Sequence, residues 1–324
     1  MYPSDFQWPN GAAIAVVFNM SWEMWQPRTL GTTVNTQRHG ETVPAGSPYG
    51  RNMMYVYQHA YGETGGMQRL LDMWKRYGIK TSCYTSGLCL ELFPGLAQRA
   101  DKEGHELLVQ GWDHAFLYEQ SVAEQTESID KTVALYKKVL GKPPVGYTTA
   151  GGTLTPESVR LSVERNFKYI AAYRNVDVPF IINHDGKKIV GQNSYALCDF
   201  NAYGHQDSTP RDIMTQWRDF FDVLYDEGLR GEPKMLAFGT HPFLAQGYRT
   251  RPIEETIQYV QSKPKVWFAT REEIADWVLK NYPDQDLSRF YPEAVNSDRW
   301  WGLAVGLGGQ EATDAAFHHR RKPG

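Results

Sequence analysis

The chain has 324 residues and a formal net charge of −3, and hydrophobic residues make up 41% of it. This apolar content can bury a large core, which excludes disordered, coiled-coil and collagen-like chains. Basic residues are scattered except in the terminal run from His318 to Lys322, whereas sequence-independent nucleic-acid binding needs a basic stripe. We therefore expect a globular protein with no nucleic-acid partner.

The cysteines and the N-terminus bear on the cellular compartment. The three cysteines, Cys83, Cys89 and Cys198, are odd in number and show no C-x-x-C spacing, so we expect neither a disulfide scaffold nor a structural zinc site. The first residues show no basic region followed by an apolar run. No stretch of about 18 apolar residues occurs either. A cytoplasmic protein without a membrane partner is expected.

The predicted elements alternate between strands and helices from the first strand onwards. Residues 12–20 (AAIAVVFNM) form a continuous apolar run, which is typical of a strand covered on both faces. Gly78 and Gly141 are predicted helix stops. Helix N-caps are predicted at Ser121, Thr155, Thr209 and Thr270. Further strands are predicted over residues 80–86, 105–110, 145–149, 169–173, 188–197, 234–241 and 265–269.

This alternation predicts a parallel sheet covered by helices. The chain has no Gly-x-Gly-x-x-Gly after its first strand and no Gly-Lys-Ser/Thr loop, which disfavours the open nucleotide-binding sheets. We predict an α/β fold, an irregular (β/α) barrel of seven or eight strands, as a single domain over residues 1–280. Residues 24–63 are predicted to form an insertion, either a lid over the site or a subunit contact. Residues 281–324 are predicted to be a C-terminal arm.

Candidate acid–base residues follow three of the predicted strands. In a parallel barrel the active site lies at the C-terminal ends of the strands. Glu23 follows the first strand, Asp113 and His114 follow the third, and His241 follows the seventh. Such groups beside aromatic walls are typical of an enzyme. The alternatives are a solvated loop carboxylate for Glu23, a capping role for Asp113, and core or surface roles for the histidines.

Other residues at the same predicted rim are candidates for substrate binding. Further histidines, His39 and His59, belong to the insertion and reach the site only if it folds over the barrel. The substrate-binding candidates are Trp22, Trp25, Gln110, Asp177, Ser86 and Thr148.

Several stretches together resemble the polysaccharide deacetylase superfamily with the NodB-homology fold, particularly its allantoinase and cyclic-imide hydrolase branch. The stretches are WPNGAAIAVVF, GGMQRLLDMWKRYGIKTSCYTSG, GHELLVQGWDH, FFDVLYDEG, PKMLAFGTHPFL and KVWFATREEIADW, which occur in order over most of residues 8–280. The family fold is an irregular (β/α) barrel, and the branch leads us to expect a homo-oligomer.

This sequence lacks most of the metal ligands of the family that it resembles. Metal-dependent members use an Asp after the first strand and a His-x-x-x-His pair after the third. Asn19, Ser21 and Gln110 stand at these positions, so His114 alone remains. A catalytic zinc normally has three protein ligands. We therefore expect no metal ligands and no cofactor, with zinc possible only if the site is rebuilt.

Other positions of the family pattern are matched in part. The family's arginine after the fourth strand is replaced by Thr148, whereas His241 matches the histidine after the seventh strand. Asp177 and Asp199 match acids of the allantoinase branch, and Glu23 matches a glutamate of that branch.

These observations lead to one functional hypothesis and two alternatives. Free water has a pKa of about 15.7, against about 7 when bound to zinc, so a metal-free site needs a side-chain base and a reactive C–N bond. We predict a hydrolase of non-peptide C–N bonds that opens a small cyclic amide, imide or ureide. Glu23 would activate water, His241 would protonate the leaving nitrogen, and His114 with Asp113 would assist. The alternatives are a metal-dependent deacetylase of an amino sugar or peptidoglycan fragment, and an inactive barrel that acts as a binding subunit.

Overall fold

The strand that leads into the predicted base has neighbouring strands on both of its sides. In the computed structural model, which describes residues 5–25, 47–174, 177–194, 197–200, 202–203 and 209–284, β1 spans Ile14–Trp22, and all nine residues are buried. It pairs in parallel with β9 along one edge and with β10 and then β2 along the other. The apolar run at residues 12–20 is thus confirmed as a fully covered strand.

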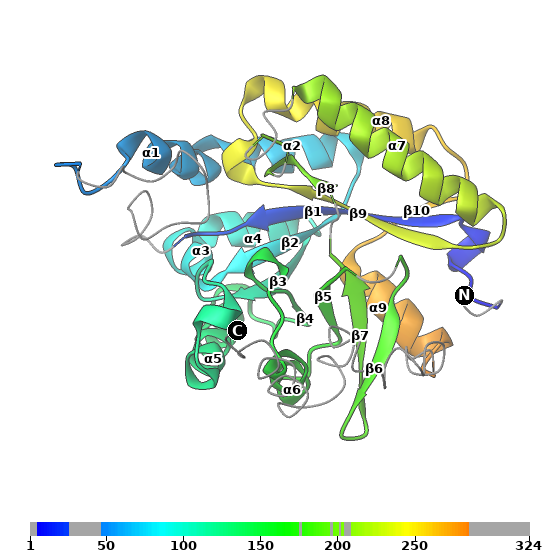
Figure 1. The fold of residues 1–324 in the computed structure, drawn as a ribbon, viewed down its shortest axis with the longest axis horizontal. Helices are drawn as coiled ribbons and strands as arrows, with labels where there is room; N and C mark the ends of the chain where they lie inside the picture. The colour runs from blue at the N-terminus through cyan, green and yellow to red at the C-terminus, as the bar shows by residue number, and fades with distance from the viewer. Residues whose placement is uncertain are drawn as a thin grey trace, which may run out of the picture.

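The sheet is almost entirely parallel. Its strands follow the order β6-β7-β5-β4-β3-β2-β1-β9-β8, with β10 pairing beside β1, and Figure 1 shows how the sheet curls. The amide of Met235 donates to the carbonyl of Asp177 at 2.7 Å. Asn193 Nδ2 donates to the carbonyl of Met235 at 3.0 Å. These bonds join opposite sides of the curled sheet, so the predicted irregular α/β barrel is confirmed.

The strand bounds show one prediction that was incomplete. The predicted strand over residues 188–197 is divided into β7 and β8, and β6 was not predicted. β6 pairs with β7 in antiparallel fashion through Asp185 and Gly186, whose φ angles are 49° and 77°. The remaining bounds are β2 Thr81–Ser86, β3 Glu106–Gly111, β4 Gly146–Tyr147, β5 Tyr169–Tyr173, β6 Phe180–His184, β7 Lys187–Asn193, β8 Leu197–Cys198, β9 Lys234–Thr240 and β10 Val266–Phe268.

Helices cover the outside of the sheet, and most of their predicted ends are confirmed. Capping boxes are present at Ser121, Thr209 and Thr270. Gly78 ends its helix in the left-handed conformation. Thr155 does not cap a helix, because its hydroxyl donates to the side chain of Gln125 at 3.0 Å. The bounds are α1 Met53–Tyr61, α2 Met67–Tyr77, α3 Gly87–Leu92, α4 Pro94–Lys102, α5 Val122–Leu140, α6 Glu157–Glu164, α7 Pro210–Leu229, α8 Arg251–Gln261 and α9 Arg271–Asn281.

Side chains of β1 alternate between an outer apolar core and the interior of the barrel. Phe18 packs in the outer core, with its ring 5.1 Å from that of Phe238 and 5.3 Å from that of Trp74. Asn19 points the other way and accepts a hydrogen bond from Arg271 Nε at 2.8 Å. Glu23 is four residues beyond Asn19, so the period of two places it on the interior side at the C-terminal end of β1.

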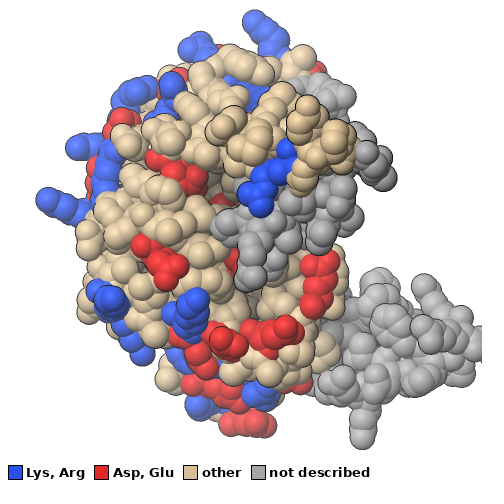
Figure 2. Space-filling view, turned by 90° about the vertical axis from the view of Figure 1, so that its left-hand side faces the viewer, with Lys and Arg blue, Asp and Glu red and all other residues tan. Residues whose placement is uncertain are grey.

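Parts of the predicted organisation lie outside the described residues. These are residues 26–46 of the predicted insertion, including His39, and the predicted arm beyond residue 284. The second half of the insertion forms α1, followed by the π-helical segment η2, Gly62–Gly66, which leads into α2. Within the described residues, every helix is too short or too polar to cross a lipid bilayer. Figure 2 shows acidic and basic side chains intermingled on one face of the molecule.

Candidate active site

Glu23 lies between two histidines at the C-terminal ends of the strands. It is 3% exposed, and its Oε2 is 3.1 Å from Nε2 of His114. The same oxygen accepts a hydrogen bond from Gln110 Nε2 at 3.1 Å. On the other side, Oε1 is 3.7 Å from Nε2 of His241. Strand β3 supplies the amide of Gln110, and the loops after β1, β3 and β9 supply the acid and the two imidazoles of one buried group.

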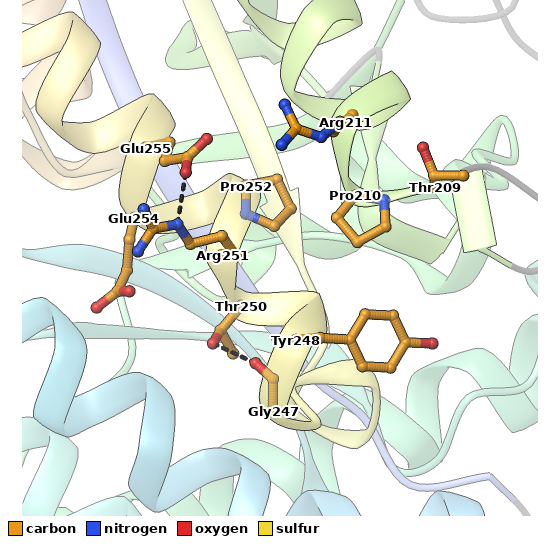
Figure 3. Close-up of a pocket in the computed structure, with 10 residues that line it drawn as sticks. All are labelled: Thr209, Pro210, Arg211, Gly247, Tyr248, Thr250, Arg251, Pro252, Glu254 and Glu255. Atoms are coloured by element: carbon orange, nitrogen blue, oxygen red, sulfur yellow. Dashed lines mark hydrogen bonds and ion pairs between the residues drawn. The ribbon is translucent and has the colours of Figure 1, made fainter.

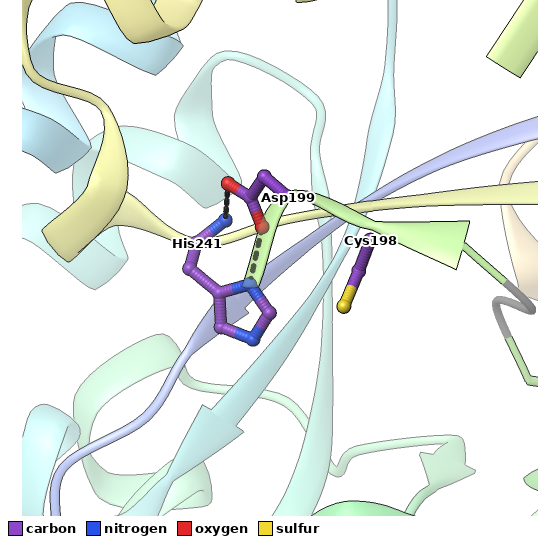
Figure 4. Close-up of side chains that lie close together, drawn as sticks. All are labelled: Cys198, Asp199 and His241. Atoms are coloured by element: carbon purple, nitrogen blue, oxygen red, sulfur yellow. Dashed lines mark hydrogen bonds and ion pairs between the residues drawn. The ribbon is translucent and has the colours of Figure 1, made fainter. Parts of the chain in front are cut away.

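His241 is oriented by a carboxylate that was not among the predicted catalytic residues. Its Nδ1 is 2.6 Å from Oδ1 of Asp199, and its backbone amide donates to Oδ2 at 2.8 Å. Figure 4 shows both contacts, with Asp199 placed directly after β8. This leaves Nε2 of His241 directed towards Glu23. The sequence signal for Asp199 was its match to an acid of the resembled branch, but the two-residue strand before it gives no pattern of its own.

His114 is positioned by the ring of Trp25 and not by Asp113. It stacks on Trp25, with ring centroids 4.2 Å apart and planes at 22°. Its backbone amide donates to the carbonyl of Met24 at 3.0 Å, which ties the two loops together. Within the described part of the chain, Nδ1 of His114 has no hydrogen-bond partner. The predicted pairing of His114 with Asp113 is therefore wrong, and the histidine–aspartate pair of this site is His241 with Asp199.

Three predicted substrate-binding residues do not face Glu23. Trp22 lies on the opposite face of β1, in the outer core, where its Nε1 donates to Glu63 Oε1 at 3.2 Å. The Thr148 hydroxyl donates to the carbonyl of Ala171 at 2.9 Å, so it is engaged by the β5 backbone. Asp177 is exposed beside the start of β9. His241 follows the end of that strand, about 20 Å away at 3.3 Å per residue.

Ser86 has a supporting position. Its hydroxyl accepts a hydrogen bond from the amide of Met24 at 3.1 Å and donates to the sulfur of Cys89 at 3.2 Å. It therefore fixes the loop that carries Glu23. Of the predicted substrate-binding residues, Trp25 and Gln110 contact the acid–base group directly.

A histidine of the insertion reaches this region from α1. His59 stacks on Phe243, with centroids 4.4 Å apart and planes at 16°. Its ring is 6.1 Å from that of Trp25, and Phe243 is 5.5 Å from His241. The insertion thus contributes an aromatic wall to this region. His59 was expected to reach the site only if the insertion folds over the barrel, and the segment that forms α1 does so.

A second carboxylate lies on the outer side of β1. Burial raises the pKa of Glu63 to about 7, and its hydrogen bonds to the backbone and to Trp22 lower the pKa by less. Glu63 belongs to η2, and Trp22 directly precedes Glu23 in the chain. The insertion therefore also contacts the strand end that carries the site.

The described residues contain one group that could hold a metal ion: Cys198, Asp199 and His241, whose ligand atoms lie within 4.8 Å of one another. As arranged, both oxygens of Asp199 bind His241, at 2.6 Å and 2.8 Å. Two ligands on one tetrahedral zinc, each bonded at about 2.0–2.2 Å, lie more than about 3 Å apart. The usual family positions offer only the neutral side chains of Asn19, Ser21 and Gln110 beside His114. These residues do not fit the family's metal.

A separate cavity of about 700 Å³ lies between the N-termini of α7 and α8. Figure 3 shows that Arg251 faces Glu255 at its edge. None of the predicted site residues lines this cavity. It is therefore distinct from the group around Glu23.

Comparisons with known proteins agree with this architecture. The polysaccharide deacetylase family profile matches residues 54–170. A Schizosaccharomyces pombe protein described as a polysaccharide deacetylase is 27% identical over 85% of this chain and 93% of its own length.

Two solved structures superpose over most of the chain. One from Pseudomonas aeruginosa, described as a probable polysaccharide deacetylase, has a TM-score of 0.74 and 27% identity, and covers 86% of this chain and 95% of that one. The structure of Puue allantoinase also has a TM-score of 0.74, at 24% identity, and covers 85% and 93%. Together with the barrel, these likenesses support the resemblance of the chain to the polysaccharide deacetylase superfamily with the NodB-homology fold, a family of hydrolases of non-peptide C–N bonds.

Proposed function

We propose that the protein hydrolyses the C–N bond of a small cyclic amide, imide or ureide by means of its own side chains. The observation that carries this proposal is the position of Glu23, between His114 and His241, with Asp199 behind His241. In this arrangement a general base and a general acid can act together on the same C–N bond.

The proton transfers follow from the directions of the side chains. Glu23 takes a proton from water, and the hydroxide oxygen attacks the carbonyl carbon of the substrate. When the tetrahedral intermediate collapses, the C–N bond breaks and the leaving nitrogen takes a proton from His241 Nε2. Asp199 accepts from Nδ1 and so stabilises the imidazolium before this transfer. His114 faces the other oxygen of Glu23 and stabilises the carboxylate's orientation.

The burial of the group favours a small ring over an extended chain. Glu23 and His241 are each 3% exposed, and His114 is 7% exposed. Within the described residues, Gln110 Oε1 and His114 Nδ1 are buried without hydrogen-bond partners. A ring that alternates N–H and C=O groups supplies partners for such atoms. The structural likeness to an allantoinase supports a ureide ring in particular.

The test is a panel of cyclic imides and ureides, namely succinimide, phthalimide, hydantoin and dihydrouracil, assayed for ring opening with and without a chelator. We expect activity that survives chelation and falls about 100-fold or more in Glu23→Gln. The variant Glu164→Gln, on the exposed face of α6, is the matched control. Inactivity towards every ring, or activity that returns only with added zinc, contradicts the proposal.

A second candidate is a metal-dependent deacetylase of an amino sugar. It is favoured by the similarity to the Schizosaccharomyces pombe protein. A purified protein with about one zinc per chain that deacetylates N-acetylglucosamine oligomers would establish it. The expectations of a homo-oligomer and of a cytoplasmic location stay predictions.

A further inference from the structure

A series of aromatic rings leads from the acid–base group to the surface along the loop after β3. Trp25 stacks on His114 at 4.2 Å. His114 lies 5.8 Å from Phe116, and Phe116 lies 5.3 Å from Tyr118. His114 is 7% exposed, Phe116 is half-buried, and Tyr118 is 65% exposed. The rings therefore connect the buried site with solvent.

The loop that presents these rings is fixed by contacts to neighbouring elements. The amide of Leu117 donates to the Thr153 hydroxyl at 3.1 Å. Gln125 Nε2 donates to the carbonyls of Leu117 and Gln120, each at 3.1 Å. Phe116 lies against Gly151, where a Cβ atom would be 2.7 Å from the ring. A fixed aromatic side chain offers contact area to a ligand at little cost in ordering.

A cation lies beside this loop, at the same end of the barrel. Arg174 directly follows β5 and is exposed. Its Nη2 is 3.5 Å from the Cβ position of Gly152, the residue after the glycine under Phe116. No carboxylate in the described part of the chain forms an ion pair with Arg174. A guanidinium of this kind binds a carboxylate through paired hydrogen bonds.

We propose that Phe116, Tyr118 and Arg174 form an outer subsite for the part of the substrate that does not react. It binds a flat ring against the two aromatic side chains and a carboxylate at Arg174. The substrate class is therefore a cyclic amide or imide that extends into a ring bearing an acid group. This inference rests on the proposed function, because His114 joins the subsite to Glu23.

The experiment uses succinimide, phthalimide and carboxyphthalimide, which add first a fused ring and then an acid. Hydrolysis is measured with the full-length protein, and equilibrium binding is measured in Glu23→Gln by calorimetry. Arg174→Gln should raise KM and Kd for carboxyphthalimide by about threefold or more relative to phthalimide. Tyr118→Ala should raise them by about threefold or more for both phthalimides relative to succinimide. The matched controls are Arg230→Gln at the end of α7 and Tyr248→Ala, which is 63% exposed.

The outcomes separate this inference from the proposed function. Hydrolysis of all three imides with unchanged selectivity in both variants overturns the subsite and leaves the function in place. Binding that depends on Arg174 and Tyr118 without any hydrolysis supports the subsite and contradicts the function. Absence of both binding and hydrolysis overturns both.

Discussion

At the scale of single residues, two carboxylates act on His241 from opposite sides. Asp199 binds the Nδ1 side and the backbone amide, while Glu23 faces Nε2 at 3.7 Å. The first contact fixes the ring and its tautomer, as a carboxylate does when it orients a catalytic imidazole. The second sets the acid and the base side by side, so that both can reach the same reacting group.

The orientation of His241 gives the first prediction. We expect Asp199→Asn to lower kcat by about 100-fold or more, because an amide does not stabilise the imidazolium that the reaction needs. Steady-state kinetics on the most reactive ring of the panel would measure this. Asp177→Asn is the control, since Asp177 is exposed at the far end of β9. Equal activity of the two variants would contradict the assigned role of Asp199.

The carboxylate of Glu63 gives a prediction about pH. Its pKa is about 7 in the folded protein against 4.5 as the ordinary value, so the folded state holds this proton more tightly. The contribution of Glu63 to stability is therefore largest below pH 4.5 and falls as the pH rises to about 7. Glutamine does not ionise, so we expect Glu63→Gln to be free of this pH-dependent decrease. Relative to the wild type, the free energy of unfolding of the variant should rise by about 1–3 kcal/mol between pH 4.5 and 8.

Urea unfolding of both proteins at several pH values measures the Glu63 effect. Because other groups titrate equally in both, the difference between the two proteins isolates this carboxylate. Glu157→Gln, at a partly exposed carboxylate on α6, should show no such pH-dependent difference. A difference that is constant across pH would refute the assigned cause.

The sequence could predict part of this site for a clear reason. Glu23, His114 and His241 follow parallel strands, and the C-terminal ends of such strands meet at one end of a barrel. The pairing of His241 with Asp199 depends on β8, which is two residues long and carries no periodicity. The direction of Trp22 was also missed, although it directly precedes Glu23 and neighbouring residues of a strand point to opposite faces.

At the scale of elements, η2 joins the insertion to the loop after β9. Gly62 and Gly66 face the backbone of Phe243 and Pro242, close to His241. A methyl group on Gly66 would lie 1.8 Å from the carbonyl oxygen of Pro242. This contact admits no side chain, and π-helical turns of this kind often lie at functional sites.

The close contact at Gly66 gives a third prediction. We expect Gly66→Ala to lower the free energy of unfolding by about 1–3 kcal/mol through overpacking. It should also lower kcat, because the loop after His241 has to move. Gly95→Ala is the control, since a Cβ atom at Gly95 meets nothing within 4 Å. Thermal unfolding and kinetics together test it, and a Gly66→Ala protein as stable and active as Gly95→Ala would refute it.

Element prediction succeeded where burial gives a simple pattern. The run of β1 is buried throughout, and the capping boxes at Ser121 and Thr270 use local hydrogen bonds, so both could be read from the sequence. The hairpin of β6 and β7 was missed although its signal was present. Asp185 and Gly186 form a two-residue turn with positive φ angles, which is a strong hairpin signal between apolar runs.

At the scale of the whole molecule, one buried arginine links distant strands. Arg271 is fully buried at the start of α9. It donates to Asn19 Oδ1 at 2.8 Å, to Gln192 Oε1 at 3.2 Å and to the carbonyl of Asn193 at 2.8 Å. These bonds join β1 and β7 through α9, which closes the interior of the barrel.

Closure by Arg271 gives the fourth prediction. We expect Arg271→Met to cost about 3–5 kcal/mol of unfolding free energy, because it leaves three buried acceptors without a donor. Arg230→Met, at the exposed end of α7, should change stability by less than about 0.5 kcal/mol. Urea denaturation of both variants makes the comparison. Similar midpoints would show that the barrel does not depend on this closure.

The pairing of β1 with β9, in which Met20 stands opposite Thr240, has a consequence for how new catalysts could arise on this scaffold. The spacing of Glu23 and His241 is inherited from a rigid hydrogen-bonded ladder, whereas Phe116 and Gly151 belong to loops on other strands. Diversifying those loops by directed evolution should therefore change which substrates bind, while Glu23 and His241 keep their positions.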